Sequence, residues 1–191
     1  MITYIIGTDT DAGKTFYGKS LIHKGHTVIK PIETGKDSFE DLNNSDAYGY
    51  CHLQKIPIEA VNLYFFKEPL SPHLASERDG ITIDKDKLLT FIETHKECFI
   101  ELAGGLMVPI TRGYTQLDLI KETKGQVDLV VGNKLGCINH ALLTLKILHQ
   151  ENIPIRNIFI NDYGKPDTPM MSDNKRVILE YWHHLIEQKN A

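Results

Sequence analysis

Short apolar runs alternate with amphipathic segments along most of the chain. The runs cover about residues 2–6, 27–30, 61–66, 98–100, 127–131 and 155–160. Unbroken, β-branched runs of this length are typical of strands that are buried on both faces of a parallel sheet. Between them, spacing and capping residues predict helices at about 16–24, 46–53, 74–78, 85–95, 115–123, up to 149, and 173–188. Alternating strands and helices indicate an α/β fold with a mostly parallel sheet and helices on both faces.

The first apolar run leads into a loop of small residues, 7–15, that ends in Gly13-Lys14-Thr15. A strand, such a loop and then a helix form the arrangement of a phosphate-binding loop. Backbone N–H groups surround an anion there, while Lys14 reaches the terminal phosphates and the Thr15 hydroxyl can ligate magnesium. The usual pattern has glycine five residues before Gly13, where this chain has Thr8. An ordinary tight turn is the alternative, and the position after a buried strand favours nucleotide binding.

Four more chemically distinctive residues lie at or just after the ends of predicted strands: Lys30, Glu101, Gly136 and Asn161. In open α/β sheets, ligands bind at the carboxyl ends of the strands. Lys30 is therefore placed to meet the same anion as the phosphate loop. Glu101 is followed closely by two glycines, which let the backbone approach a ligand. It lies at a strand end, where phosphate-loop enzymes have a second carboxylate that helps to bind magnesium. Each residue alone is compatible with a surface lysine or a turn, but their convergence on one edge favours a single site.

Composition narrows the class of protein. The 191 residues are 41% hydrophobic and 24% charged, as in a soluble globular protein, and suit one domain over residues 1–191. A net charge of −4 gives no basic face for nucleic acid. No run approaches the roughly 18 apolar residues of a membrane span, and the first residues form a core strand rather than a signal peptide. Cys51, Cys98 and Cys137 are scattered, which favours a reducing compartment, so we expect a cytoplasmic protein without nucleic-acid or membrane partners.

Seven segments together resemble the dethiobiotin synthetase family: residues 7–15, 30–35, 44–47, 68–73, 101–109, 131–143 and 161–162. The string KLGCINH at residues 134–140 is long, unusual and highly specific. The resemblance implies a single phosphate-loop domain that works as a homodimer. It implies an ATP- and Mg²⁺-dependent ligase that closes the ureido ring of dethiobiotin from 7,8-diaminononanoate and CO2. A carbamate and a carbamic–phosphoric mixed anhydride are the implied intermediates.

The same resemblance implies roles for individual residues. The implied catalytic residues are Lys30, Lys14 and Thr10, with the two lysines placed between carbamate and γ-phosphate. The implied magnesium ligands are Thr15, Asp46 and Glu101. Nucleotide contacts are implied for Asp11, Ala12, Gly13, Lys14, Thr15, Phe16, Asp46, Glu101, Leu102, Ala103, Gly104, Asn161 (to adenine) and Asp162. Substrate contacts are implied for Thr10, Lys30, Thr34 and Gly104 and, from the other subunit, for Leu135, Gly136, Cys137, Ile138 and Asn139.

Two departures from the family pattern affect the site. Leu102 stands where the family usually has glycine, which reduces backbone freedom beside Glu101. Nothing after Met171 resembles the family's loop that packs on the base. We therefore expect weak nucleotide affinity without substrate and modest discrimination between triphosphates. The alternative is that the last helix folds over the base, with Tyr181 or Trp182 stacking on it.

Three other classes of phosphate-loop protein are alternatives to this one. Partitioning-type or nucleotide-switch ATPases, which act through partner binding, carry a lysine four residues before the Gly-Lys-Thr glycine, where this chain has Asp9. Guanine-specific GTPases have Asn-Lys-x-Asp, and residues 133–136 lack the aspartate. Amidating ligases of corrin synthesis need a glutamine-hydrolysing domain, for which 191 residues leave no room. The partitioning or switch ATPase is the leading alternative.

Overall fold

A five-stranded parallel sheet forms the centre of the molecule, with strand order β2-β5-β1-β8-β9. The structure, a computed structural model, describes residues 2–35 and 45–190. The sheet strands are β1 (Thr3–Gly7), β2 (Val28–Ile29), β5 (Phe99–Gly105), β8 (Gln126–Gly132) and β9 (Ile155–Asn161). Each lies near a predicted apolar run, and the predicted α/β class is confirmed.

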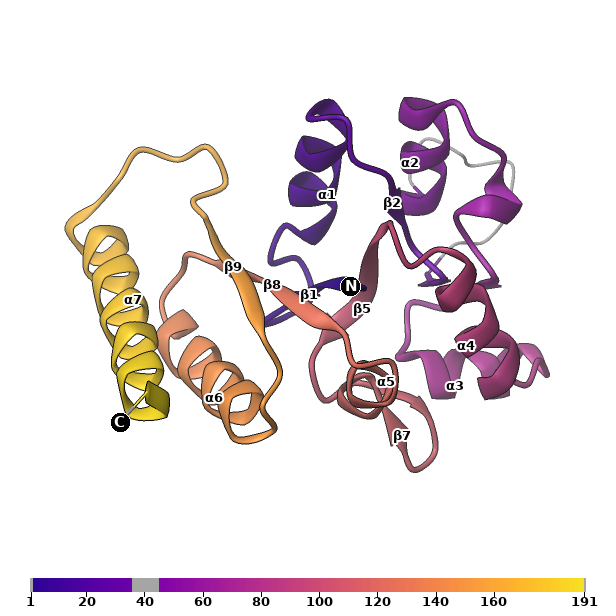
Figure 1. Ribbon diagram of the computed structural model, residues 1–191. Coiled ribbons are helices and arrows are strands. Elements are labelled where there is room, and N and C mark those ends of the chain that lie inside the picture. The colour runs from indigo at the N-terminus through magenta and orange to yellow at the C-terminus, as the bar shows by residue number, and fades with distance from the viewer. Residues whose placement is uncertain (1, 36–44, 191) are drawn as a thin grey trace.

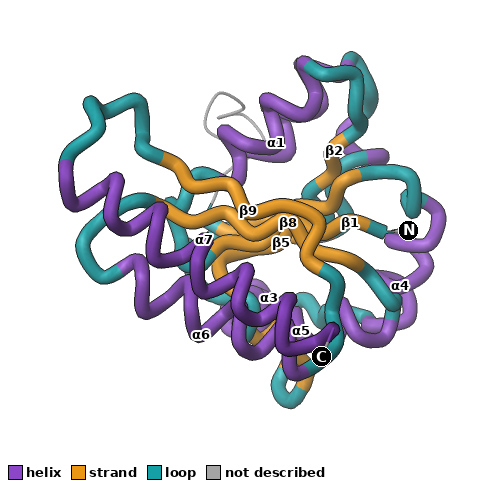
Figure 2. Tube along the Cα trace, turned by 60° about the vertical axis from the view of Figure 1, so that its left-hand side comes forward, coloured by secondary structure: helices purple, strands orange, loops and turns teal. Residues whose placement is uncertain are grey.

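Helices cover both faces of this sheet (Figures 1 and 2). They are α1 (Lys14–His23), α2 (Asp46–Gln54), α3 (Pro72–Asp79), α4 (Lys85–Thr94), α5 (Gln116–Glu122), α6 (Cys137–Gln150) and α7 (Pro169–Asn190). Helix α1 lies on one face, whereas α5 and α6 lie on the other, and α7 packs against α6. Within residues 2–35 and 45–190, no helix is long and apolar enough to cross a membrane.

The apolar runs are unbroken because both faces of their strands are covered. Tyr4, Ile5 and Ile6 in β1 are completely buried, as is the run 129–131 in β8. Burying each such large side chain stabilises the fold by about 1.5–3 kcal/mol, before conformational entropy is counted. The sheet core therefore gives the strand ends a rigid support.

One charged network lies inside this apolar sheet. Asp128 on β8 is fully buried and forms an ion pair with Arg156 of β9. Its carboxylate also accepts a 2.8 Å hydrogen bond from the hydroxyl of Tyr17 on α1. A buried carboxylate requires such partners, and these three residues tie α1 to the two strands.

Several predicted boundaries are wrong, and two small sheets were not predicted. The predicted strand at 61–66 is limited to β4 (Tyr64–Phe66), which follows a 3₁₀ helix at Ile58–Ala60 and pairs in parallel with β3 (Ile32–Thr34). A hairpin of β6 (Pro109–Thr111) and β7 (Tyr114–Thr115) forms the other sheet. The pairing in both small sheets depends on contacts between short segments, and the periodicity of apolar residues in the sequence does not reveal such contacts.

Proline and glycine account for three other differences in boundaries. Helices α3 and α7 start at Pro72 and Pro169, because proline is tolerated in the first turn, where its missing N–H would have no partner. Strand β5 continues through its two glycines to Gly105, since pairing with β1 overrides their turn tendency. The predicted start of α2 is correct: Ser45 caps it by accepting a 3.2 Å hydrogen bond from Tyr48 N–H. The family segment at 44–47 begins at Asn44, which lies outside the described residues.

The topology fixes where a ligand binds. From β1, the chain runs to the edge strand β2, returns to form β5 between β2 and β1, and then crosses β1 to add β8 and β9 on the other side. The strand order reverses at β1, and in open α/β sheets the crevice at such a switch point holds the ligand. The phosphate loop lies directly after β1 and joins it to α1.

Candidate active site

A cavity of about 920 Å³ opens at the carboxyl ends of the central strands. Its volume suits a nucleotide together with a small substrate. The predicted site residues that line it are Thr10, Asp11, Gly13, Lys14, Thr15, Phe16, Lys30, Thr34, Asp46, Glu101, Ala103, Gly104 and Asn161. The fold thus brings together residues from five separate parts of the chain.

The phosphate loop presents Lys14 from the first turn of α1. Gly13 precedes this helix with a φ of 99°, a left-handed conformation that favours glycine. The Lys14 ammonium donates a 3.2 Å hydrogen bond to the Asp9 carbonyl oxygen and is largely buried. Burial lowers the pKa of Lys14, although the nearby carboxylate of Glu101 opposes this shift. Lys14 is therefore a desolvated cation with little competition from water for an incoming anion.

Lys30 joins two carboxylates at the other side of the cavity. It follows β2 and forms ion pairs with Asp46, at the start of α2, and with Glu101, in β5, the latter at 3.0 Å. Burial alone would lower the pKa of Lys30, but the carboxylates of Glu101 and Asp46 outweigh burial and raise it. Lys30 therefore stays charged at neutral pH.

Thr15 and Tyr50 complete the surroundings of Glu101. The Thr15 hydroxyl donates to one Glu101 oxygen at 3.3 Å, and the Tyr50 hydroxyl donates to the other. Burial and the adjacent Glu101 raise the pKa of Tyr50 well above its ordinary value, which keeps this donor protonated. Tyr50 was not predicted from the sequence, where it is one of two tyrosines in a polar helix.

The predicted magnesium ligands fit the ion chemically. Thr15, Asp46 and Glu101 gather around Lys30 and offer only oxygen atoms, which Mg²⁺ prefers. Among the residues the structure describes, no cluster of three or more acidic, histidine or cysteine ligands exists. Magnesium usually binds to one or two carboxylates together with water and phosphate oxygens.

Glu33 positions Asp46 and was missed in the sequence. It is 1% exposed, and its carboxylate accepts hydrogen bonds from the Ser45 hydroxyl at 2.5 Å and from the N–H groups of Asp46 and Ala47 at 2.7 and 3.2 Å. A carboxylate at a helix N-terminus is stabilised by these N–H groups and by the helix dipole. The available sequence signal was an acidic residue directly after an apolar one in the short run that became β3.

Gln116 is a second supporting residue that sequence reasoning missed. Its amide nitrogen donates to the Ala103 carbonyl oxygen, and the residue is 1% exposed. Ala103 and Gly104 line the cavity directly after Glu101 and Leu102. Gln116 therefore fixes the backbone of β5 where it borders the site. Leu102 itself is buried and does not line the cavity.

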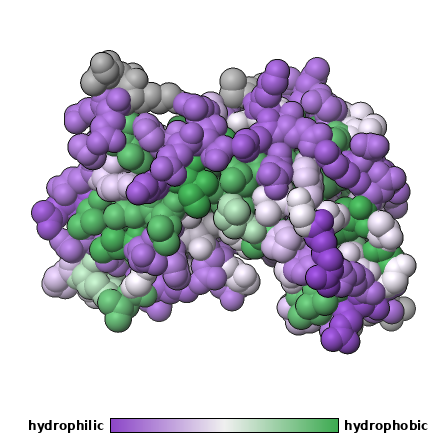
Figure 3. Space-filling model, turned by 90° about the horizontal axis from the view of Figure 1, so that it is seen from below, coloured by the Kyte–Doolittle hydropathy of each residue, from purple (hydrophilic) through white to green (hydrophobic). Residues whose placement is uncertain are grey.

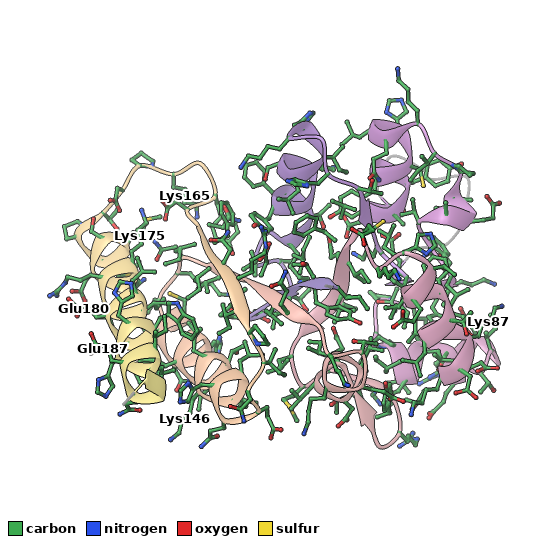
Figure 4. The ribbon with its side chains drawn as sticks, viewed as in Figure 1. Lys87, Lys146, Lys165, Lys175, Glu180 and Glu187 are labelled. Atoms are coloured by element: carbon green, nitrogen blue, oxygen red, sulfur yellow. The ribbon has the colours of Figure 1, made fainter. Side chains whose placement is uncertain are left out.

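The remaining predicted residues do not line the cavity. Ala12 is buried within the phosphate loop. Asp162 forms a 2.7 Å ion pair with Lys175 of α7, labelled in Figure 4, and accepts a hydrogen bond from Asn133. The segment 135–139 lies around the start of α6, outside the cavity of its own chain, and Leu135 is 86% exposed.

Tyr163 is the aromatic residue that the structure adds beside Asn161. It lines the cavity, whereas Tyr181 and Trp182 on α7 pack against the core and do not. The alternative in which either α7 aromatic stacks on a base is therefore wrong for this arrangement of the chain. The sequence signal for Tyr163 was its position directly after the Asn-Asp pair at the end of β9.

Comparison with known proteins extends these findings. A family model described as an AAA domain matches residues 3–186. The chain is 40% identical over 179 residues to the ATP-dependent dethiobiotin synthetase BioD of Legionella pneumophila (strain Corby), covering 90% of this chain and 84% of that protein. It is 37% identical to the BioD protein of Lysinibacillus sphaericus and 34% identical to that of Idiomarina loihiensis, covering 82% and 85% of them and 93% and 91% of this chain.

Two solved structures share the fold at low sequence identity. A ParA family ATPase from Chlorobium tepidum has a TM-score of 0.55 at 13% identity, covering 93% of this chain and 80% of that one. The kinase domain of the Escherichia coli tyrosine kinase ETK has a TM-score of 0.50 at 14% identity, covering 87% and 70%. Likeness at this level shows a shared phosphate-loop fold.

Proposed function

Because the chain belongs to the ATP-dependent dethiobiotin synthetase family, we propose that its cavity closes the ureido ring of dethiobiotin from 7,8-diaminononanoate, CO2 and ATP. The family membership makes the chain an ATP-dependent ligase. One observation carries the detailed proposal: Lys14 and Lys30, both buried, line one cavity with the carboxylates of Asp46 and Glu101.

The proposed reaction has three bond-forming steps. One substrate amine adds to CO2 and loses a proton, which gives a carbamate anion. A carbamate oxygen then attacks the γ-phosphorus of ATP, ADP leaves, and a carbamic–phosphoric mixed anhydride remains. The second amine attacks the carbamoyl carbon, the ring closes with loss of a proton, and inorganic phosphate departs.

The middle step brings two anions together, and the lysines meet that need. Lys14 projects from the phosphate loop and Lys30 from the end of β2, on two sides of one cavity. Fixed positive charges in a partly desolvated site stabilise charge that develops during phosphoryl transfer, because they need no reorganisation. Thr10, Thr34 and the backbone at Gly104 are proposed to hold the carbamate and the amines.

Thr15, Asp46 and Glu101 are proposed as the residues that would hold magnesium, since all three offer oxygen atoms. When bound there, the ion would neutralise charge on the phosphate oxygens. Glu33 keeps Asp46 at the start of α2, and Tyr50 holds Glu101, so this chain maintains both carboxylates in place without the ion.

A homodimer with shared active sites is proposed from the segment 135–139. The segment lies outside the cavity of its own chain; Leu135, Gly136 and Asn139 are exposed, whereas Cys137 is buried. Leu143 of α6 is 54% exposed. Figure 3 shows apolar surface on the side of the molecule where α6 and α7 lie. The start of α6 is proposed to bind the carboxylate of the substrate in the partner's cavity, as helix N-termini readily do.

The partitioning or switch ATPase is disfavoured by the position where such proteins have their extra lysine. Asp9 there forms a 3.0 Å ion pair with Lys134 of the same chain. The direct test is mass spectrometric detection of dethiobiotin after incubation of the protein with 7,8-diaminononanoate, labelled bicarbonate, ATP and Mg²⁺. We expect labelled product that depends on all four components. ATP hydrolysis without product would contradict the ligase and favour the switch.

A further inference from the structure

Two side chains from the end of β9 hold two consecutive carbonyl groups of the phosphate loop. The Asn161 amide nitrogen donates to the Ala12 carbonyl oxygen at 3.1 Å. The Tyr163 hydroxyl donates to the Asp11 carbonyl oxygen at 2.9 Å. The Asn161 amide oxygen in turn accepts a 3.0 Å hydrogen bond from the Tyr163 N–H, so the two residues form one unit. We call this pair of side chains the carbonyl clamp.

The backbone leaves space for the clamp at two glycines. A Cβ atom at Gly13 would lie 2.0 Å from the Asn161 amide nitrogen, and one at Gly132 would lie 2.0 Å from the Tyr163 hydroxyl oxygen. No side chain fits at such distances, so both clamp contacts require glycine opposite them. The two clamp contacts therefore depend on Gly13 and Gly132.

The clamp also joins two residues with unusual backbone conformations. Asp11 and Tyr163 both have φ values of 57°, in the left-handed region that residues other than glycine rarely adopt. Such conformations persist only where surrounding contacts impose them, and they concentrate at ligand sites. Burial raises the pKa of Tyr163 above its ordinary value, so its hydroxyl keeps the proton that it donates.

Peptide geometry gives the clamp a consequence for phosphate binding. In a planar trans peptide, the carbonyl and the following N–H point in opposite directions. Fixing the carbonyls of Asp11 and Ala12 therefore also fixes the N–H groups of Ala12 and Gly13, directed away from the clamp. Within the part of the chain that the structure describes, these two N–H groups have no hydrogen-bond acceptor.

We propose that Tyr163, together with Asn161, is a positioning residue that orients the N–H groups of Ala12 and Gly13 toward the phosphates before the nucleotide binds. The proposal deepens the proposed function and rests on it for the identity of the ligand. It assigns Tyr163 an action on the phosphates, through the loop backbone, and not on the base. Without its hydroxyl, the Asp11–Ala12 peptide is free to rotate, and phosphate binding must order it.

The test separates phosphate from base by using inorganic tripolyphosphate, which has no base. Dissociation constants for tripolyphosphate and for ATP, both with Mg²⁺, are measured by titration calorimetry on the full chain. Tyr163→Phe removes only the hydroxyl. Tyr114→Phe is the matched control, because its hydroxyl also donates one 2.8 Å hydrogen bond, to Glu122, away from the cavity.

Tyr163→Phe is expected to weaken the binding of tripolyphosphate and of ATP by the same factor. That factor is about three- to tenfold, the scale of one neutral hydrogen bond. Tyr114→Phe should leave both dissociation constants unchanged. In turnover, Tyr163→Phe should raise the KM for ATP and leave kcat nearly unchanged, since the clamp acts on binding. Tyr163→Gly, which suits the left-handed backbone and also lacks the hydroxyl, should weaken tripolyphosphate at least as much.

Three outcomes overturn the proposal. The first is an unchanged affinity of Tyr163→Phe for tripolyphosphate, and the second is a loss of affinity for ATP alone. The third is a wild-type affinity of Tyr163→Gly for tripolyphosphate. Each would show that the hydroxyl does not prepare the phosphate loop. The binding measurements need no diaminononanoate. Failure to form dethiobiotin would therefore count against the proposed ligase, whereas the titrations alone decide whether the clamp prepares the loop.

Discussion

Replacing Lys30 with glutamine tests the electrostatic account of the site most severely. The change removes a positive charge but keeps a side chain of similar length that still donates hydrogen bonds. In the native protein the Lys30 side chain is 9% exposed and pairs with Glu101 at 3.0 Å and with Asp46. The Glu101 side chain is 1% exposed and the Asp46 side chain 35% exposed, so the loss falls mainly on Glu101.

Two separate magnitudes follow from this geometry. Leaving a buried carboxylate without its partner costs about 3 kcal/mol of unfolding free energy, and the hydrogen bonds from Thr15 and Tyr50 reduce that loss. Removing one preorganised charge from the path of phosphoryl transfer lowers kcat by about a hundredfold or more. The KM for ATP should change less, because Lys30 lies outside the phosphate loop. Saturating Mg²⁺ should recover part of the lost stability, because the ion would bind to the same carboxylates.

The assay measures initial rates of dethiobiotin formation at varied ATP, together with thermal unfolding with and without Mg²⁺. Lys85→Gln is the matched control, since Lys85 forms a 2.9 Å ion pair with Glu122 in which both side chains are well exposed. Pairs of this kind contribute little to stability. A Lys30→Gln protein whose kcat stays within about threefold of wild type would refute the role of Lys30 in the transition state, since the expected loss is far larger.

Three further predictions concern the rest of the site. If two subunits share each site, mixing an inactive Asn139→Ala protein with an inactive Lys14→Gln protein should restore activity, because one hybrid site carries neither change; a fully active monomer in sedimentation would contradict sharing. If base contacts are few, kcat/KM for ATP, GTP and CTP at equal Mg²⁺ should lie within about tenfold, since one neutral hydrogen bond contributes about 0.5–1.5 kcal/mol, whereas a preference for ATP above about a hundredfold would reveal a built adenine pocket. Glu33→Ala removes the acceptor for the N–H of Asp46 and should lower the unfolding free energy by about 2 kcal/mol and weaken magnesium binding. Its control is Glu187→Ala on the exposed side of α7 (Figure 4). Equal unfolding free energies and equal magnesium affinities in the two variants would count against a role of Glu33 at the start of α2.

Local chemistry made much of this fold predictable. The apolar runs became strands because helices cover both faces of the sheet, and the loop before Lys14 took its place because a strand and a helix flank it. Lys30 and Glu101 met because parallel strands end at one edge, although their separation in the chain is large. These features follow from the parallel topology, which the alternation of strands and helices in the sequence already predicts.

The supporting residues were not predictable, because their roles depend on contacts between distant segments. Glu33 and Gln116 look like ordinary polar residues until the fold places them beside Asp46 and Ala103. Tyr163 became a cavity residue because the loop after β9 turns back to the phosphate loop, whereas the sequence suggested aromatic contacts only as an alternative, from the last helix. Periodicity reports which face of an element is buried, and it does not report which loop reaches a ligand.

The fate of one oxygen atom tests the central claim most directly. If a carbamate attacks the γ-phosphorus in this cavity, an oxygen from CO2 leaves with the phosphate. A short incubation with 18O-labelled bicarbonate, 7,8-diaminononanoate, ATP and Mg²⁺, followed by mass spectrometry of the phosphate, measures that transfer. The proposed ligase predicts one labelled oxygen in the phosphate for each dethiobiotin formed, and no phosphate release without the diamine. Phosphate that takes its new oxygen from water would contradict the claim.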